Sequence, residues 1–195
     1  MILVGFKGEF IVRQTMLIAI LFFISGAAFA EVPFQFAAPN LRAPDDPKVS
    51  GIRLSVLHGR NATVRGADFG FLSMSETGNL SGFGAIFGIG RVTGGMRGCS
   101  TALMNLHTGR DSGVNAAFIN RIDTMEHGAN VGFVNVADGY TMVDVGGLNV
   151  SDRSTVQLGL MNITNKIESF QFGFINIAEN GFLPVFPIFN FPKPN

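Results

Sequence analysis

The C-terminal half of the chain repeats a short phrase in which apolar and other residues alternate. In TVQLGLMNI, Leu158 and Leu160 share one face of an extended strand with Asn162. SFQFGFINI repeats the arrangement, and turn-forming residues follow each phrase. This period of two predicts one β-strand per phrase. Helical periodicity is missing from the repeat, so the sequence predicts an all-β domain. In SFQFGFINI, the strand face that holds Asn176 also holds Phe170, Phe172 and Phe174.

The closing asparagine recurs along the chain and serves as an anchor for counting repeats. Its spacings are 15, 15, 14, 13, 14 and 14 residues. Upstream, the phrase ends at His58, at Ser73 and near Ile89 without the asparagine. The sequence therefore predicts about ten units of 13–16 residues between positions 51 and 190. A glycine often opens the unit seven residues before the anchor: Gly51, Gly66, Gly98, Gly113 and Gly128. The anchors are Asn105, Asn120, Asn135, Asn149, Asn162, Asn176 and Asn190.

A short unit with one apolar face cannot bury that face alone, so similar units are expected to stack. In a parallel β-solenoid or β-roll, neighbouring coils place the anchor asparagines about 4.8 Å apart. Each amide can then bond the next, which satisfies a polar group that is costly to bury alone. The sequence thus predicts a ladder through all seven anchors. The apolar faces, including the Phe row at 170–174, are expected to form the continuous core.

An antiparallel β-meander or barrel, as found in outer membranes, is the alternative architecture. Acidic residues three positions after the anchors bear on this choice, because parallel stacking places Asp123, Asp138 and Asp152 beside one another. Neighbouring carboxylates repel by about 0.9 kcal/mol per pair in water. A divalent cation such as Ca²⁺ would relieve the repulsion, which makes these three residues weak metal candidates. Ordinary turn chemistry at a solvated corner is the simpler interpretation. An antiparallel meander would separate the charges.

The N-terminus has the features of a secretory signal. Lys7 and Arg13 precede an apolar stretch that is too short for a typical membrane-spanning helix, and Ala28-Phe29-Ala30 is a small-x-small cleavage sequence. We therefore expect a signal peptide at 1–30 with cleavage after Ala30, then an N-terminal cap or linker at 31–50. The β-repeat domain is expected at 51–190 and a C-terminal tail at 191–195. Proline-rich segments at both ends of the repeat would protect its open edges.

Composition and isolated side chains add few candidate functions. The chain has 14 basic and 14 acidic residues, which does not favour nucleic-acid binding. The single cysteine, Cys99, excludes an internal disulfide and is expected to be packed in the interior. Polar residues in two consecutive turns could form a small metal or acid–base site, although a solvated corner is the simpler interpretation. No cofactor motif is recognisable. The polar residues of the two turns that could form this metal or acid–base site are His107, Asp111, Asp123, Glu126 and His127.

Several phrases resemble a known group of proteins. GANVGFVNV, LGLMNI and FGFINI, together with the ending NGFLPVFPIFNF, resemble small uncharacterised exported surface-repeat proteins of vibrios and related Gram-negative bacteria. The resemblance covers nearly all of residues 49–191 and implies export and a repetitive β domain. Some of these proteins carry a polyhydroxyalkanoate-synthase label. Such synthases resemble α/β-hydrolases with a G-x-C-x-G nucleophile elbow, whereas the sequence around Cys99 is RGCST.

These observations predict a non-enzymatic exported repeat protein with a structural or interaction role in the cell envelope or at the surface. Its partner would lie in the envelope or outside the cell, and membrane association is left open. The periplasm, outer membrane and cell surface are all compatible locations. An outer-membrane barrel is the first functional alternative, and a polyhydroxyalkanoate-synthase-like enzyme is the least favoured. No cofactor is expected.

Overall fold

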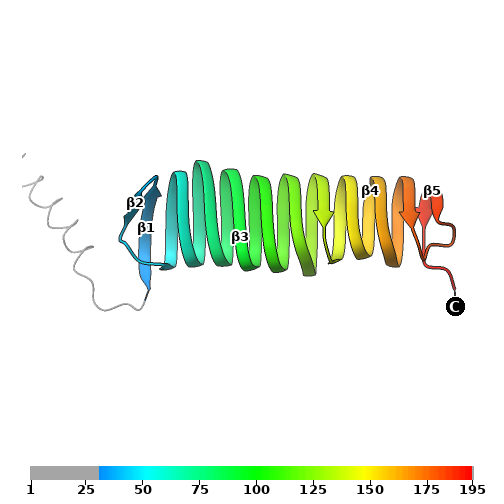
Figure 1. Ribbon diagram of the computed structural model, residues 1–195, viewed down its shortest axis with the longest axis horizontal. Coiled ribbons are helices and arrows are strands. Elements are labelled where there is room, and N and C mark those ends of the chain that lie inside the picture. Colours follow the sequence, from blue (N-terminus) through cyan, green and yellow to red (C-terminus); the bar gives the residue numbers. More distant parts are fainter. Residues whose placement is uncertain (1–30, 195) are drawn as a thin grey trace, which may run out of the picture. The chain divides into compact units, whose positions relative to one another are not determined.

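A computed structural model of the chain describes residues 31–194, so the expected signal peptide and the cleavage after Ala30 lie outside the described residues. This part of the chain contains five β-strands and no helix. Two of the strands are very long because their ribbon winds continuously through successive coils (Figure 1). The strands are β1 (Val32–Ala38), β2 (Leu41–Ala43), β3 (Lys48–Ala137), β4 (Tyr140–Ala178) and β5 (Val185–Asn190).

The coils of β3 and β4 stack in parallel, which confirms the all-β solenoid. Where β3 meets β4, Val134 pairs with Leu148 and Asn135 pairs with Asn149. The stack has about eight turns rather than ten. The seven anchors and the three upstream phrase ends make ten positions, which bound nine intervals. The last interval, which ends at Asn190, is not a parallel coil. Parallel pairing also decides against the antiparallel meander for the repeat.

Antiparallel strands close both ends of the stack. At the N-terminal end, β1 pairs in parallel with β3 and carries β2 as an antiparallel neighbour. At the C-terminal end, β5 runs antiparallel to β4, with Phe172 opposite Phe189. The coils therefore extend from Lys48 to Ala178, and the segment around Asn190, predicted to belong to the repeat, forms part of the C-terminal cap.

A column of glycines lines one corner of the coils in β3. Gly113 shows why glycine is needed, because its φ of +135° is rarely adopted by other residues and a Cβ there would lie 1.8 Å from the Gly98 carbonyl oxygen. The structure adds Gly82 to the five predicted members. The column ends at Gly128, just before the coils shorten from 15 to 14 and 13 residues. Its members are Gly51, Gly66, Gly82, Gly98, Gly113 and Gly128.

The interior is largely polar, which overturns the expectation of a continuous apolar core. Apolar packing within the stack is concentrated near its N-terminal end, in the cluster of Val49, Val64, Leu80, Val92 and Met96. Elsewhere Ile122, Met125 and Ile167 are also buried, but amides, hydroxyls and a few charged groups occupy most inward positions. These polar residues include Asn115, Asn130, Thr141, Asp144, Gln157, Thr164 and Gln171.

The Phe row at 170–174 is exposed, so its predicted place in the core was wrong. Gln171 and Asn176 both point inward although an odd number of positions separates them, so the alternation must break once between them. The break leaves Phe174 and Ile175 outside together, at 77% and 40% exposure. A strict period of two had placed Phe174 on the same face as Asn176.

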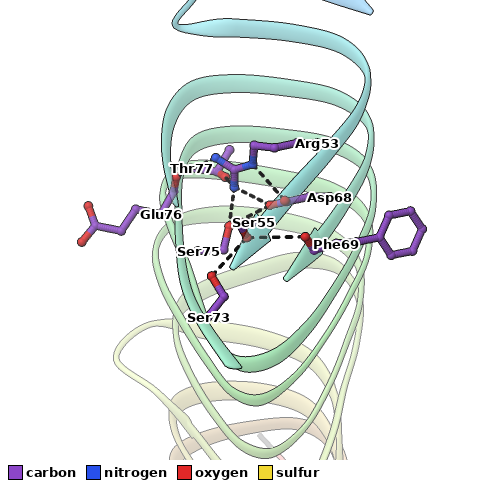
Figure 2. A network of polar contacts seen from close by, with 8 residues as sticks. All are labelled: Arg53, Ser55, Asp68, Phe69, Ser73, Ser75, Glu76 and Thr77. Carbon is purple, nitrogen blue, oxygen red and sulfur yellow. Dashed lines mark hydrogen bonds and ion pairs between the residues drawn. The ribbon is translucent and has the colours of Figure 1, made fainter. Parts of the chain in front are cut away.

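A buried ion pair replaces the amides in the first coils (Figure 2). The Arg53 guanidinium is fully buried, and its Nε donates to Asp68 Oδ1 at 2.9 Å. It also donates to the Thr77 hydroxyl at 2.7 Å and to the Ser75 hydroxyl, which in turn donates to Asp68 Oδ2 at 2.9 Å. Because hydroxyl and carbonyl oxygens surround the pair, both buried charges are hydrogen-bonded.

Candidate functional site

One outer face of the stack carries a large apolar side chain at the same place in nearly every coil. These residues stand two positions before an anchor or, in the two upstream coils, before the phrase end at Ser73 or Ile89. Each exposes between 53% and 77% of its surface. We call this set the apolar stripe. It consists of Phe71, Phe87, Leu103, Phe118, Phe133, Leu160 and Phe174.

Neighbouring rings within the stripe contact one another. Phe118 and Phe133 stack with ring centroids 5.3 Å apart and an interplanar angle of 6°, and Phe71 and Phe87 lie at 6.1 Å. The stripe is interrupted at Gly147, where the Phe133 ring comes within 3.1 Å of the position that a Cβ would occupy. Exposed residues one or two positions from a stripe residue in the sequence widen the face. Among them are Leu72, Val131, Met161, Phe172 and Ile175.

A ladder of buried asparagine side chains lies under this face. Each amide nitrogen donates to the side-chain oxygen of the next anchor, at 2.8–2.9 Å, from Asn105 through to Asn176. The predicted ladder is therefore present for six of the seven anchors. Asn190 does not belong to it: its amide donates to the Leu183 carbonyl at 3.1 Å and to Gln171 Oε1 at 3.5 Å. The antiparallel direction of β5 removes it from the parallel register.

The G-x-x-N spacing within the phrase has a direct structural reason. Asn135 donates a second hydrogen bond, at 3.0 Å, to the Val145 carbonyl in the next coil, next to Gly146. A Cβ on Gly146 would lie 2.7 Å from Asn135 Nδ2 and 2.2 Å from the Gly132 carbonyl oxygen. The same bond recurs from Asn149 and Asn162 to the residues before Gly159 and Gly173. The glycine thus lets the asparagine reach the next backbone, and the pair positions the outward residue between them.

The acidic residues proposed as weak metal candidates lie on a different, polar corner. Arg121 donates to both Asp138 carboxylate oxygens at 2.6 Å, and this pairing raises the pKa of the guanidinium, with a further contribution from Asp123. Asn165 donates to Asp152 Oδ1 at 2.8 Å. Arg121 thus supplies the positive charge that relieves the repulsion. Within residues 31–194, no three His, Cys, Asp or Glu side chains are close enough together to hold a metal ion.

An open groove runs along the same polar corner in the C-terminal half of the stack. Its lining carries both signs of charge, and Tyr140 lies half-buried within it. The Tyr140 hydroxyl contacts the Thr155 hydroxyl at 2.8 Å, and the Arg153 guanidinium lies 4.9 Å from the ring centroid. Neighbouring Arg and Glu side chains pair across it, as Arg110 and Glu126 do at 3.1 Å. Several of the polar groups in the groove are therefore paired with one another.

The structure divides the polar residues of the two turns between interior and surface. His107 Nδ1 lies 2.5 Å from Asp111 Oδ2, and both side chains are fully buried. Glu126 and His127 face outward instead. Because the His107–Asp111 pair has no opening to solvent, it is unsuited to acid–base work on a dissolved substrate. Cys99 is half-buried, whereas the sequence had predicted that it packs fully in the interior.

The sequence had predicted that the apolar residues of the stripe lie in the core, whereas the structure places them on the surface. The available signal was the odd separation of inward polar residues, such as Gln157 to Asn162 and Gln171 to Asn176. No family model, curated protein or solved structure matches this chain. Among residues 31–194 there is no helix with the length and apolar character needed to cross a membrane.

Proposed function

We propose that this protein is a non-enzymatic, exported scaffold that binds a partner through the apolar stripe. Its place would be the cell envelope or the cell surface. The observation that carries the proposal is the repetition of an outward apolar side chain over the stripe's coils, while polar groups are buried behind it. A soluble protein rarely exposes a continuous apolar patch of this size unless the patch is used for binding.

The rigid support of the stripe also favours a binding role. The ladder amides and the next-coil carbonyls hold each coil in register, so outward side chains such as Phe118 and Phe133 repeat at the spacing of the coils. Ordered, pre-positioned aromatic side chains bind with a smaller entropic cost than mobile ones. Long regular surfaces of this kind are the usual binding surfaces of repeat solenoids.

The arrangement of reactive groups favours a scaffold over an enzyme. The His107–Asp111 pair is sealed inside the stack, and the charged residues of the polar corner, such as Arg121 and Asp138, neutralise one another. The exported location rests on the N-terminal sequence pattern described above. Its direct check is the mass of the protein purified from cells, because processing after Ala30 would leave a chain beginning at Glu31.

Fractionation of the producing cell tests the proposed function. The chain is expressed from Met1, and its retention in envelope fractions through carbonate and urea washes is compared with that of Phe118→Ser/Phe133→Ser. We expect the double variant to fold, because both side chains are exposed, and to be released by milder washing. Val114→Ser, which removes an exposed apolar side chain outside the stripe, is the matched control. Equal retention of the double variant and the wild type would contradict binding through the stripe.

A further inference from the structure

We infer that the occupant of the apolar stripe is the stripe of a second copy of this chain, in an antiparallel two-fold dimer. The inference rests on the proposed function, because both use the same face. It adds the identity of the partner and the register in which the two copies meet. A two-fold pair brings the same surface of both copies together, so one self-complementary stripe is sufficient.

The accessible area of the stripe matches what a stable pair of proteins needs. Its seven side chains are each more than half exposed, and each offers roughly 100 Å² to a partner. Together with the flanking Leu72, Val131, Met161, Phe172 and Ile175, they present on the order of 800–1,000 Å². Standard protein–protein interfaces bury about 800 Å² per partner. The stripe spans eight coils, which is about 34 Å from the first to the last at the usual strand spacing.

The chemistry of the stripe favours a protein partner over a lipid surface. Its members are Phe and Leu, which have no polar tip, whereas membrane interfaces are typically anchored by Trp and Tyr. The sequence contains no Trp, and the single Tyr140 lies on the polar corner. The chain remaining after cleavage at Ala30 holds 12 basic and 13 acidic residues, so its net charge is close to zero and provides little attraction to anionic lipid and little repulsion between two copies.

The sequence of the stripe also selects the relative direction of the two copies. Full overlap in an antiparallel pair places the two-fold axis at the midpoint of the eight coils, between Phe118 and Phe133. Phe118 of each copy then faces Phe133 of the other, and Leu103 faces the interruption at Gly147. A parallel pair would instead place the two Gly147 interruptions opposite each other and leave a gap. Close packing at the centre of an interface therefore favours the antiparallel pair.

Sedimentation velocity and light scattering on the protein purified from cells producing the full chain measure its mass over a range of concentrations. We expect a dimer for the wild type. Phe118→Lys alone and Phe133→Glu alone should each weaken the dimer at least about tenfold, because a charge replaces a central aromatic contact. Ser169→Lys and Ser169→Glu place the same charges on an exposed corner outside the stripe and should leave the dimer intact. Far-UV circular dichroism checks that every variant keeps the solenoid.

Mixing the two charged variants tests the register. In the antiparallel pair, Lys at position 118 of one copy faces Glu at position 133 of the other, and the remaining Phe118 and Phe133 face each other. The mixture should therefore regain dimer, as a heterodimer visible by native mass spectrometry. In a parallel pair each introduced charge would face a phenylalanine, and mixing would restore nothing.

The possible results separate this inference from the proposed function. A wild type that stays monomeric, or that forms a dimer insensitive to both charged variants, overturns the second copy as occupant. Binding of the monomer to neutral phosphatidylcholine vesicles, with loss in Phe133→Glu, would assign the stripe to a lipid surface instead. If the chain is monomeric and Phe118→Ser/Phe133→Ser still loses envelope retention, the dimer is refuted and the scaffold function stands.

Discussion

Replacing Asn135 with alanine tests whether the buried ladder holds the coils together. Asn135 occupies the middle of the ladder and is buried. Its side chain accepts a hydrogen bond from Asn120 at 2.8 Å and donates to Asn149 Oδ1 at 2.8 Å and to the Val145 carbonyl at 3.0 Å. Alanine removes all three bonds and leaves one donor and two acceptors without these partners in the interior.

The expected loss of stability follows from those three groups. A buried polar group deprived of its partner costs about 1–3 kcal/mol, so we expect Asn135→Ala to lower the free energy of unfolding by about 3 kcal/mol or more. Entry of a water molecule into the vacated space would keep the loss near the lower value. Small domains have only about 5–15 kcal/mol in total, so the effect should be large.

Urea denaturation measures this change, with unfolding followed by far-UV circular dichroism in the β-strand band. The m-value checks that the same amount of chain unfolds in both proteins. Asn165→Ala is the matched control. It removes an asparagine bond to Asp152 at an exposed corner and should cost no more than about 0.5 kcal/mol. If Asn135→Ala and Asn165→Ala have equal effects, the ladder does not stabilise the stack, and the reasoning is refuted.

Three further predictions concern other buried positions. Burial raises the pKa of Asp144, so the unfolded chain releases this proton at a lower pH than the folded chain, and the stability of the folded chain falls as the pH rises above about 4, the ordinary carboxyl value. Asp144→Asn should therefore raise the melting temperature at pH 7 and raise it less at pH 4. Equal destabilisation at both pH values would contradict this. Asp68→Asn leaves the buried Arg53 charge without its counter-charge and should cost about 3–5 kcal/mol in urea denaturation, whereas the exposed Asp138→Asn should cost less than about 1 kcal/mol. Gly113→Ala introduces a Cβ 1.8 Å from a neighbouring carbonyl oxygen at a φ of +135°, and should lower the free energy of unfolding by about 1–3 kcal/mol or more. An unchanged melting temperature would refute the close approach.

The repeat could be predicted from the sequence because its strongest signals are local. The spacing of Asn105 to Asn176 set the coil length, and the ladder followed from the standard distance between strands. The glycine seven positions before the anchor marked the corner that the structure places at Gly113 and its equivalents. The proline-containing ends were expected to cap the stack, and antiparallel β1–β2 and β5 lie there.

The direction of the side chains could not be predicted from alternation alone. A coil must bend within each turn, and every bend shifts the inward phase by one residue, as between Gln171 and Asn176. Apolar residues were therefore assigned to the inside, although a coil of 13–15 residues encloses a narrow interior that amides can fill completely. The role of Arg121 between Asp123 and Asp138 was also missed, because its partner lies 17 positions away in the next coil.

The asparagine ladder has a direction. Every amide from Asn105 to Asn162 donates toward the C-terminal end, so the side-chain dipoles add head to tail instead of cancelling. Hydrogen bonds in such a chain polarise one another and strengthen together. The line is terminated at both ends: the Ser100 hydroxyl donates to Asn105 Oδ1 at 3.0 Å, and Asn176 Nδ2 donates to the Phe186 carbonyl at 3.1 Å. The stack is thus an electrically polar fibre of fixed length, and loss of one rung would weaken the rungs on both sides of it.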